Sequence, residues 1–123
     1  MSDPTYVLFY VANPTRSAAF YADLLGKQPV ENSPGFALFV FGNGLKFGLW
    51  KRDEIEPAAS GAPGSSEICI AVDNRADVAK MHEDWRKRDV TIAQAPSDLD
   101  FGHTFVALDP DGHRLRVFSP TAA

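Results

Sequence analysis

Residues 5–25, TYVLFYVANPTRSAAFYADLL, place a run of β-branched and aromatic residues directly before a run with helical spacing. Residues 67–88, EICIAVDNRADVAKMHEDWRKR, repeat this order. The opening run of each stretch is too short for a helix and predicts a buried strand. Asn13 in one stretch, and Asp73 or Asn74 in the other, can then cap a helix. In the first of these helices, Ala19, Phe20 and Leu24 recur at helical spacing. The two stretches therefore predict two copies of a strand followed by a helix.

Three more strands are expected after each helix. They are predicted at about 28–31, 36–41 and 45–51 in the first half, and near 90–94, 103–108 and 113–118 in the second. Turn residues separate the last two strands of each half, with Asn43-Gly44 suiting a tight hairpin and DPDG at 109–112 suiting a type I turn. Each half thus reads strand, helix, strand, strand, strand.

The equivalence of the halves can be checked by position. A shift of 61 maps Val11 onto Val72, and a later shift of 68 maps Phe47 onto Leu115. A repeated element order indicates an internal duplication. The fold class predicted is α+β: two tandem βαβββ modules, 5–51 and 67–118, forming curved mixed sheets around a cavity. Residues 52–66 are rich in Pro, Gly, Ala and Ser and are predicted to be a linker within a single domain, 1–123.

Composition restricts the class of protein. The net charge of −4 argues against nucleic-acid binding, which requires clustered Lys and Arg. A single cysteine, Cys69, excludes an intramolecular disulfide. The N-terminus lacks the pattern of a signal peptide, and no apolar run approaches the roughly 20 residues of a membrane helix. We expect a cytoplasmic protein with no membrane partner.

The element order, together with YVANPTRSAAFYADLLG in the first half and FGHTFVALDPDGHRLRVFSP at the end of the second, resembles the vicinal-oxygen-chelate superfamily. This superfamily includes glyoxalase I, bleomycin-resistance proteins and extradiol dioxygenases. The resemblance covers about residues 5–120 and is similar in detail to small resistance proteins of the phenazine-binding kind. It implies paired curved sheets that enclose a cavity, and a homodimer as the active unit.

The resemblance also implies where a metal would be held. Enzymes of this superfamily use His, Gln or Glu near the start of the first strand and on the last strand of each half. The matching positions here are Tyr6, Gly48, Glu67 and Arg116. A divalent cation needs several oxygen or nitrogen donors, and a guanidinium repels it. The expectation is that the metal site is lost, with no cofactor.

Glu67 and Arg116 are instead expected to form an ion pair where the metal would have been. This pair could brace the sheets, orient a ligand, or take part in a cryptic reaction, and the sequence leaves these roles open. The three histidines, His82, His103 and His113, share no obvious face and lack the spacing of a helical metal motif.

Strand alternation assigns the side chains that would line the cavity. If Tyr6 faces inward, as the resemblance implies, so do Tyr10, Trp50 and Phe118, with Gly48 leaving room for a flat aromatic guest. The opposite strand parity, Phe47 with Leu49 and Leu115 with Val117, is apolar and is expected to pack on the helices. Cys69 is predicted to be a small buried filler and Trp85 a core residue. The predicted ligand-binding residues are Tyr6, Tyr10, Gly48, Trp50, Glu67, His103, Arg116 and Phe118; no catalytic or metal-binding residue is predicted.

The function expected first is metal-independent binding and sequestration of a planar aromatic small molecule, such as a phenazine antibiotic, with binding favoured over catalysis. The alternative is a glyoxalase- or dioxygenase-type metalloenzyme with a rearranged site. A third reading is an interaction module whose cavity is vestigial and which acts through its dimer.

Overall fold

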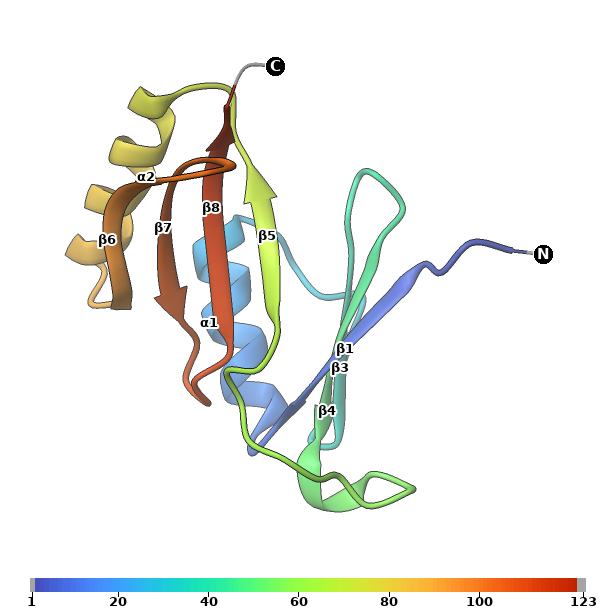
Figure 1. Ribbon diagram of the computed structural model, residues 1–123. Helices are drawn as coiled ribbons and strands as arrows, with labels where there is room; N and C mark the ends of the chain where they lie inside the picture. Colours follow the sequence, from blue (N-terminus) through green and yellow to red (C-terminus); the bar gives the residue numbers. More distant parts are fainter. Residues whose placement is uncertain (1, 122–123) are drawn as a thin grey trace. The chain divides into compact units, whose positions relative to one another are not determined.

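The computed structural model describes residues 2–121 and divides the chain into two compact units, one ending at Ala62 and the other beginning at Pro63. The first unit contains β1 (Tyr6–Val11), α1 (Pro14–Leu25), β2 (Glu31–Asn32), β3 (Phe36–Val40), β4 (Lys46–Lys51) and the 3-10 helix η1 (Arg52–Glu54). The second contains β5 (Glu67–Ala71), α2 (Arg75–Lys87), β6 (Thr91–Leu99), β7 (Gly102–Leu108) and β8 (Arg114–Pro120) (Figure 1). Both units therefore carry the βαβββ order, and the predicted duplication is confirmed.

Each unit forms one four-stranded mixed sheet. The strand orders are β1-β4-β3-β2 and β5-β8-β7-β6, so the two sheets have the same topology. The first strand of each sheet, β1 or β5, pairs in parallel with the last, β4 or β8, and the remaining pairs are antiparallel. The α+β class with two mixed sheets is confirmed.

The helices begin at the predicted caps. The Oδ1 atom of Asn13 accepts a hydrogen bond from the backbone N–H of Arg16 at 3.2 Å, and Oδ1 of Asn74 accepts one from that of Asp77 at 2.9 Å. These bonds satisfy donors that the first helical turn cannot pair internally. Gly26 ends α1 in the left-handed conformation, at φ 65°. Among the described residues, no helix combines the length and apolarity that crossing a bilayer requires.

In the first unit, one face of the sheet packs on α1. Phe47 and Leu49 of β4 are fully buried on this face, as predicted. The Tyr21 ring of α1 lies edge-on to Phe47, with centroids 4.9 Å apart. The sequence pattern emphasised Ala19, Phe20 and Leu24, but the helix buries a different stripe, made of Pro14, Ser17, Ala18 and Tyr21.

In the second unit, α2 covers one face of its sheet. Leu115 and Val117 of β8 are fully buried there, and Trp85 of α2 is only 2% exposed, so all three predictions are confirmed. The Trp85 ring meets Phe105 of β7 edge-on at 5.4 Å. A separate apolar core thus lies beneath each helix, which leaves the opposite face of each sheet without a helix.

Several predicted boundaries need correction. The strand expected at 28–31 is only Glu31–Asn32, and the one expected at 90–94 extends to Leu99. The longer strand contains two register shifts, between Ile92 and Gln94 and between Gln94 and Ser97, which let it continue past Pro96. The predicted linker is not structureless, because it starts with η1 and buries Ile55.

Candidate functional site

The helix-free face of the first sheet carries a group of aromatic side chains that we call the Trp50 surface. The strand register places Trp50 between Tyr10 of β1 and Phe36 of β3. The Tyr10 and Trp50 rings meet edge-on, with centroids 6.4 Å apart. All three side chains are partly exposed. The surface comprises Tyr6, Leu8, Tyr10, Phe36, Leu38, Lys46, Gly48 and Trp50.

Gly48 does not leave an open space in this face. A Cβ atom added at Gly48 would lie 2.5 Å from Cδ2 of Leu8 and 3.0 Å from two ring atoms of Phe36. The two neighbouring side chains thus lean over the glycine. The room expected for a guest at this position is occupied by Leu8 and Phe36.

Tyr6 lies at the exposed end of the same face. Its side chain is 57% exposed, and the Nζ atom of Lys46 lies 5.2 Å from the centre of its ring. At this distance a cation is attracted by the face of the ring. The Trp50 surface therefore ends in a tyrosine paired with a positive charge.

The helix-free face of the second sheet is organised around Arg116, and we call it the Arg116 surface. The Nε atom of Arg116 donates to Oε1 of Glu67 at 2.6 Å, and the two side chains are 13% and 29% exposed. The predicted ion pair is thus confirmed. The surface comprises Glu67, Cys69, Phe101, Thr104, Val106, Arg114, Arg116 and Phe118.

Polar side chains from β6 and β7 also hold the Arg116 guanidinium. Its Nη1 atom donates to the hydroxyl of Thr104 at 3.2 Å and to Oε1 of Gln94 at 3.5 Å. The fully buried Thr104 hydroxyl itself donates to the Val117 carbonyl at 2.8 Å. Sequence reasoning did not identify Thr104 or Gln94 as members of this network.

Aromatic rings complete the Arg116 surface. The Phe101 ring, 44% exposed, lies with its centre 5.5 Å from Cζ of Arg116. Phe118 meets Phe101 edge-on at 5.7 Å. The sequence placed Phe118 on this face, whereas Phe101 could not be assigned to either face from its position alone.

The ion pair changes the ionisation of two neighbouring groups. The hydrogen bond from Arg116 lowers the pKa of Glu67; burial partly opposes this effect, and the charges of Arg116 and Arg114 reinforce it. Desolvation raises the pKa of the Cys69 thiol, and the Glu67 carboxylate, 3.7 Å away, raises it further. Glu67 is therefore charged and Cys69 protonated at neutral pH.

Cys69 is exposed, so its prediction as a buried filler is wrong. The reason is its place in the sheet: β5 is an edge strand, and Cys69 points to the face without a helix. A protonated thiol is a weak nucleophile and a poor metal ligand. The residue thus contributes little reactivity to the Arg116 surface.

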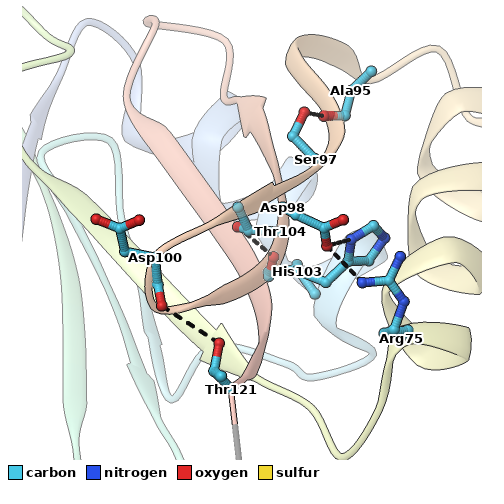
Figure 2. A network of polar contacts seen from close by, with 9 residues as sticks. Arg75, Ala95, Ser97, Asp98, Asp100, His103, Thr104 and Thr121 are labelled. Atoms are coloured by element: carbon cyan, nitrogen blue, oxygen red, sulfur yellow. Dashed lines mark hydrogen bonds and ion pairs between the residues drawn. The ribbon is translucent and has the colours of Figure 1, made fainter.

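His103 lies on the opposite face of the second sheet from Arg116. In the β7–β8 register, Thr104 is opposite Phe118 and His103 is opposite Ser119, so His103 points toward the α2 side. Figure 2 shows Asp98 between His103 and Arg75. The Oδ1 atom of Asp98 lies 2.8 Å from Nδ1 of His103 and accepts a hydrogen bond from Nη1 of Arg75 at 2.5 Å. Arg75 lowers the pKa of Asp98 most, and His103 lowers it further. The structure thus brings His103 to the start of α2 and not to the predicted group around Arg116.

The four positions that would hold a metal do not provide a suitable donor set. Gly48 has no side chain, Arg116 is a cation, and the Glu67 carboxylate is already bonded to that cation. Tyr6 supplies a phenol beside Lys46. Within the described part of either unit, no three His, Cys, Asp or Glu side chains come together as a metal site. Hard divalent cations require several carboxylate, carbonyl or water oxygens, so these residues do not fit the metal of the related enzymes.

A separate depression of about 430 Å³ lies at the start of the connection in the first unit, lined by Ala12, Arg52, Asp53, Ile55, Ala58 and Ala59. It contains none of the predicted site residues. The Nη2 atom of Arg52 donates to the Gly61 carbonyl at 2.6 Å, so this arginine tethers the connecting segment. Its lining favours a structural role.

Two proteins of known activity are similar in sequence to this chain. The chain is 36% identical over 117 residues to the phenazine antibiotic resistance protein EhpR of Enterobacter agglomerans, covering 93% of this chain and 89% of that protein. It is 31% identical over 113 residues to a trivalent organoarsenical cleaving enzyme of Bacillus sp. (strain MD1), covering 88% and 67%. Both similarities extend over nearly all of this chain.

Two solved structures share the fold of this chain. The solution structure of a protein from Agrobacterium tumefaciens is 45% identical, with a TM-score of 0.91 and coverage of 99% of this chain and 100% of that one. A glyoxalase-related enzyme from Fulvimarina pelagi shares the fold at 21% identity, with a TM-score of 0.82 and coverage of 100% and 94%. The profile of one superfamily matches residues 4–117. The chain therefore belongs to the Glyoxalase/Bleomycin resistance protein/Dioxygenase superfamily, and the resemblance inferred from its sequence is confirmed.

Proposed function

We propose that the chain binds a planar aromatic small molecule without a metal, and protects the cell by sequestering an antibiotic of the phenazine kind. The similarity to a phenazine antibiotic resistance protein, at 36% identity over 117 residues, supports this class of ligand. The residues at the four metal positions support binding without a metal, because they include a cation and a glycine in place of donors. The proposed function thus requires no chemical step.

The observation that carries the proposal is the position of Trp50. Its indole lies partly exposed between Tyr10 and Phe36 on a face that α1 does not cover. Large aromatic side chains are usually buried or hydrogen-bonded in a core, and a group of them on an open sheet face is suited to a flat apolar guest. Stacking on one such ring contributes about 0.5–1.5 kcal/mol beyond the area that is buried.

Tryptophan fluorescence tests this proposal directly. The chain has two tryptophans, and Trp85 is buried against Phe105, so the emission of Trp50 can be isolated by comparing the wild type with Trp50→Phe. Phenazine should quench the wild type in a saturable way, and most of that quenching should be absent from Trp50→Phe.

Calorimetry on Trp50→Ala provides the matched measurement. The affinity for phenazine should fall at least about tenfold, which corresponds to about 1.4 kcal/mol, while the circular dichroism spectrum stays unchanged. Unchanged affinity would show that Trp50 is not the platform. Loss of folding would show that Trp50 is a core residue, and no binding by the wild-type protein would refute the function itself.

The assembly and location are part of the same proposal. The two units would act as a single domain, and the active form would be a homodimer in the cytoplasm, as is usual for the relatives that the sequence resembles. Light scattering coupled to gel filtration tests the dimer. A monomer at micromolar concentration would contradict it.

A second candidate is an enzyme with a rearranged site, of glyoxalase or dioxygenase type. The 31% identity to a trivalent organoarsenical cleaving enzyme favours keeping this alternative. Elemental analysis of the purified protein distinguishes this enzyme from the metal-independent binding protein. Stoichiometric nickel, zinc, manganese or iron, together with loss of activity on chelation, would favour the enzyme over the binding protein.

A further inference from the structure

We infer that the Arg116 surface selects aromatic ligands that carry a carboxylate, an inference that rests on the proposed function and narrows its ligand class. Arg116 is held on two of its three nitrogens, by Glu67 at Nε and by Thr104 and Gln94 at Nη1. Among the described residues, its Nη2 atom has no hydrogen-bond partner. Because a guanidinium carries five N–H donors in a fixed plane, this edge keeps two donors for a ligand.

The hydrogen bonds to Glu67, Thr104 and Gln94 fix the orientation of the Arg116 guanidinium and therefore of its Nη2 edge. The Arg116 side chain is only 13% exposed, and its contacts come from three strands, β5, β6 and β7. An arginine fixed in this way loses little conformational entropy when it binds an oxygen anion. Hydrogen bonds between a guanidinium and a carboxylate are also stronger than those between neutral groups. The geometry therefore suits an anionic group better than a neutral amide.

The charges around the guanidinium favour the same ligand. On the strand positions that share this face, Arg114 and Arg116 provide two positive charges and Glu67 one negative charge. The register of β5 and β8 sets Arg114 directly opposite Glu67, and Arg116 is hydrogen-bonded to the same carboxylate. Glu67 neutralises one arginine, and the excess positive charge attracts an anion.

The Arg116 surface also contains aromatic rings that can contact the aromatic part of the ligand. The ring of Phe101 covers part of the guanidinium at 5.5 Å and is 44% exposed, and Phe118 supports that ring from its edge. Flat rings and guanidinium planes both stack on aromatic guests. An aromatic acid can thus place its ring against the phenylalanines and its carboxylate at the open edge of Arg116.

The test compares two ligands of nearly the same shape, phenazine-1-carboxylate and phenazine-1-carboxamide, by isothermal titration calorimetry at neutral pH. The wild type should bind the carboxylate about tenfold more tightly than the carboxamide, a difference of about 1.4 kcal/mol. Arg116→Gln should bring this ratio close to one. Arg114→Gln removes a charge from the same strand and face but leaves the held guanidinium, so it should lower the ratio only in part and by less than Arg116→Gln does.

Arg116→Gln leaves Glu67 without its partner, so a Glu67→Gln/Arg116→Gln double variant serves as the folded reference and should show the same loss of preference. Equal binding of both ligands by the wild type would overturn the selectivity and leave the proposed function standing. A ratio that persists in the Arg116 variants, or falls equally in Arg114→Gln, would also overturn it. If neither phenazine binds, both the inference and the proposed function fail.

Discussion

Replacing Glu67 with Gln measures how much the central ion pair contributes to stability. Gln keeps the shape and can still accept a hydrogen bond from Arg116, so only the assistance from charge is lost. Hydrogen bonds to charged groups contribute about 1.5–3 kcal/mol, against about 0.5–1.5 kcal/mol for neutral ones. Because Glu67 is 29% exposed and water screens the pair, we expect a loss near the lower end of that difference, about 1 kcal/mol. In a chain of 123 residues this lowers the Tm by about 4 °C.

The same variant predicts a pH dependence with a definite sign. Arg116 holds the pKa of Glu67 below its ordinary value, so the folded state binds this proton less tightly than the unfolded chain. The stabilisation by Glu67 is therefore complete above the ordinary pKa of about 4.3 and is lost as the pH falls through the lower, folded value. Urea denaturation of the wild type and Glu67→Gln should show a difference near neutral pH that shrinks in acid.

Glu83→Gln is the matched control for this experiment. Glu83 also pairs with an arginine, Arg86, at 2.6 Å, but both groups lie on the surface of α2. Exposed pairs of this kind contribute little. A similar loss in both variants, no loss in Glu67→Gln at neutral pH, or a loss that persists unchanged in acid would refute the reasoning.

Three further outcomes are expected. Trp85→Ala should lower the free energy of unfolding by about 3–5 kcal/mol, because it opens a cavity beneath α2. Urea titration measures this loss, and a loss below about 1 kcal/mol would mean that the surrounding side chains collapse into the cavity. Gly102→Ala should destabilise by more than about 2 kcal/mol, because its Cβ would collide with a backbone carbonyl of β8. Gly48→Ala should cost less than about 1 kcal/mol, because its Cβ meets only side chains, the flexible end of Leu8 and the edge of the partly exposed Phe36 ring. Equal effects of the two substitutions would contradict this contrast. Glu67→Gln should lower the pKa of the Cys69 thiol and speed its reaction with a disulfide reagent near neutral pH, and an unchanged rate would show that desolvation alone controls the thiol.

Much of the architecture could be predicted because it depends on local sequence patterns that occur in both halves of the chain. The caps at Asn13 and Asn74 and the apolar parity of Leu115 and Val117 follow from nearest-neighbour chemistry, and all are present in the structure. The ion pair of Glu67 with Arg116 was expected from the resemblance to the superfamily, because the two residues match positions that hold the metal in its enzymes.

Features that depend on register were harder to predict. The length of β6 results from two register shifts around Gln94, which a sequence does not show. The face of His103 could have been inferred, since the tight turn at 109–112 sets Thr104 opposite Phe118. On α1, Phe20 looked like the core residue, but a rotation of one position buries Tyr21 against Phe47 instead.

The packing of each helix on its own sheet has an evolutionary consequence. Since each half buries most of its fully enclosed apolar residues beneath its own helix, substitutions of the partly exposed residues on the opposite face leave those residues in place. The two copies of an ancestral half were thus free to diverge on that face. Gly48 and Arg116 occupy equivalent positions, yet one is overlaid by Leu8 and Phe36 while the other anchors a charged network. Duplication followed by separate specialisation of the two helix-free faces gave one short chain both an aromatic surface and an ionic one.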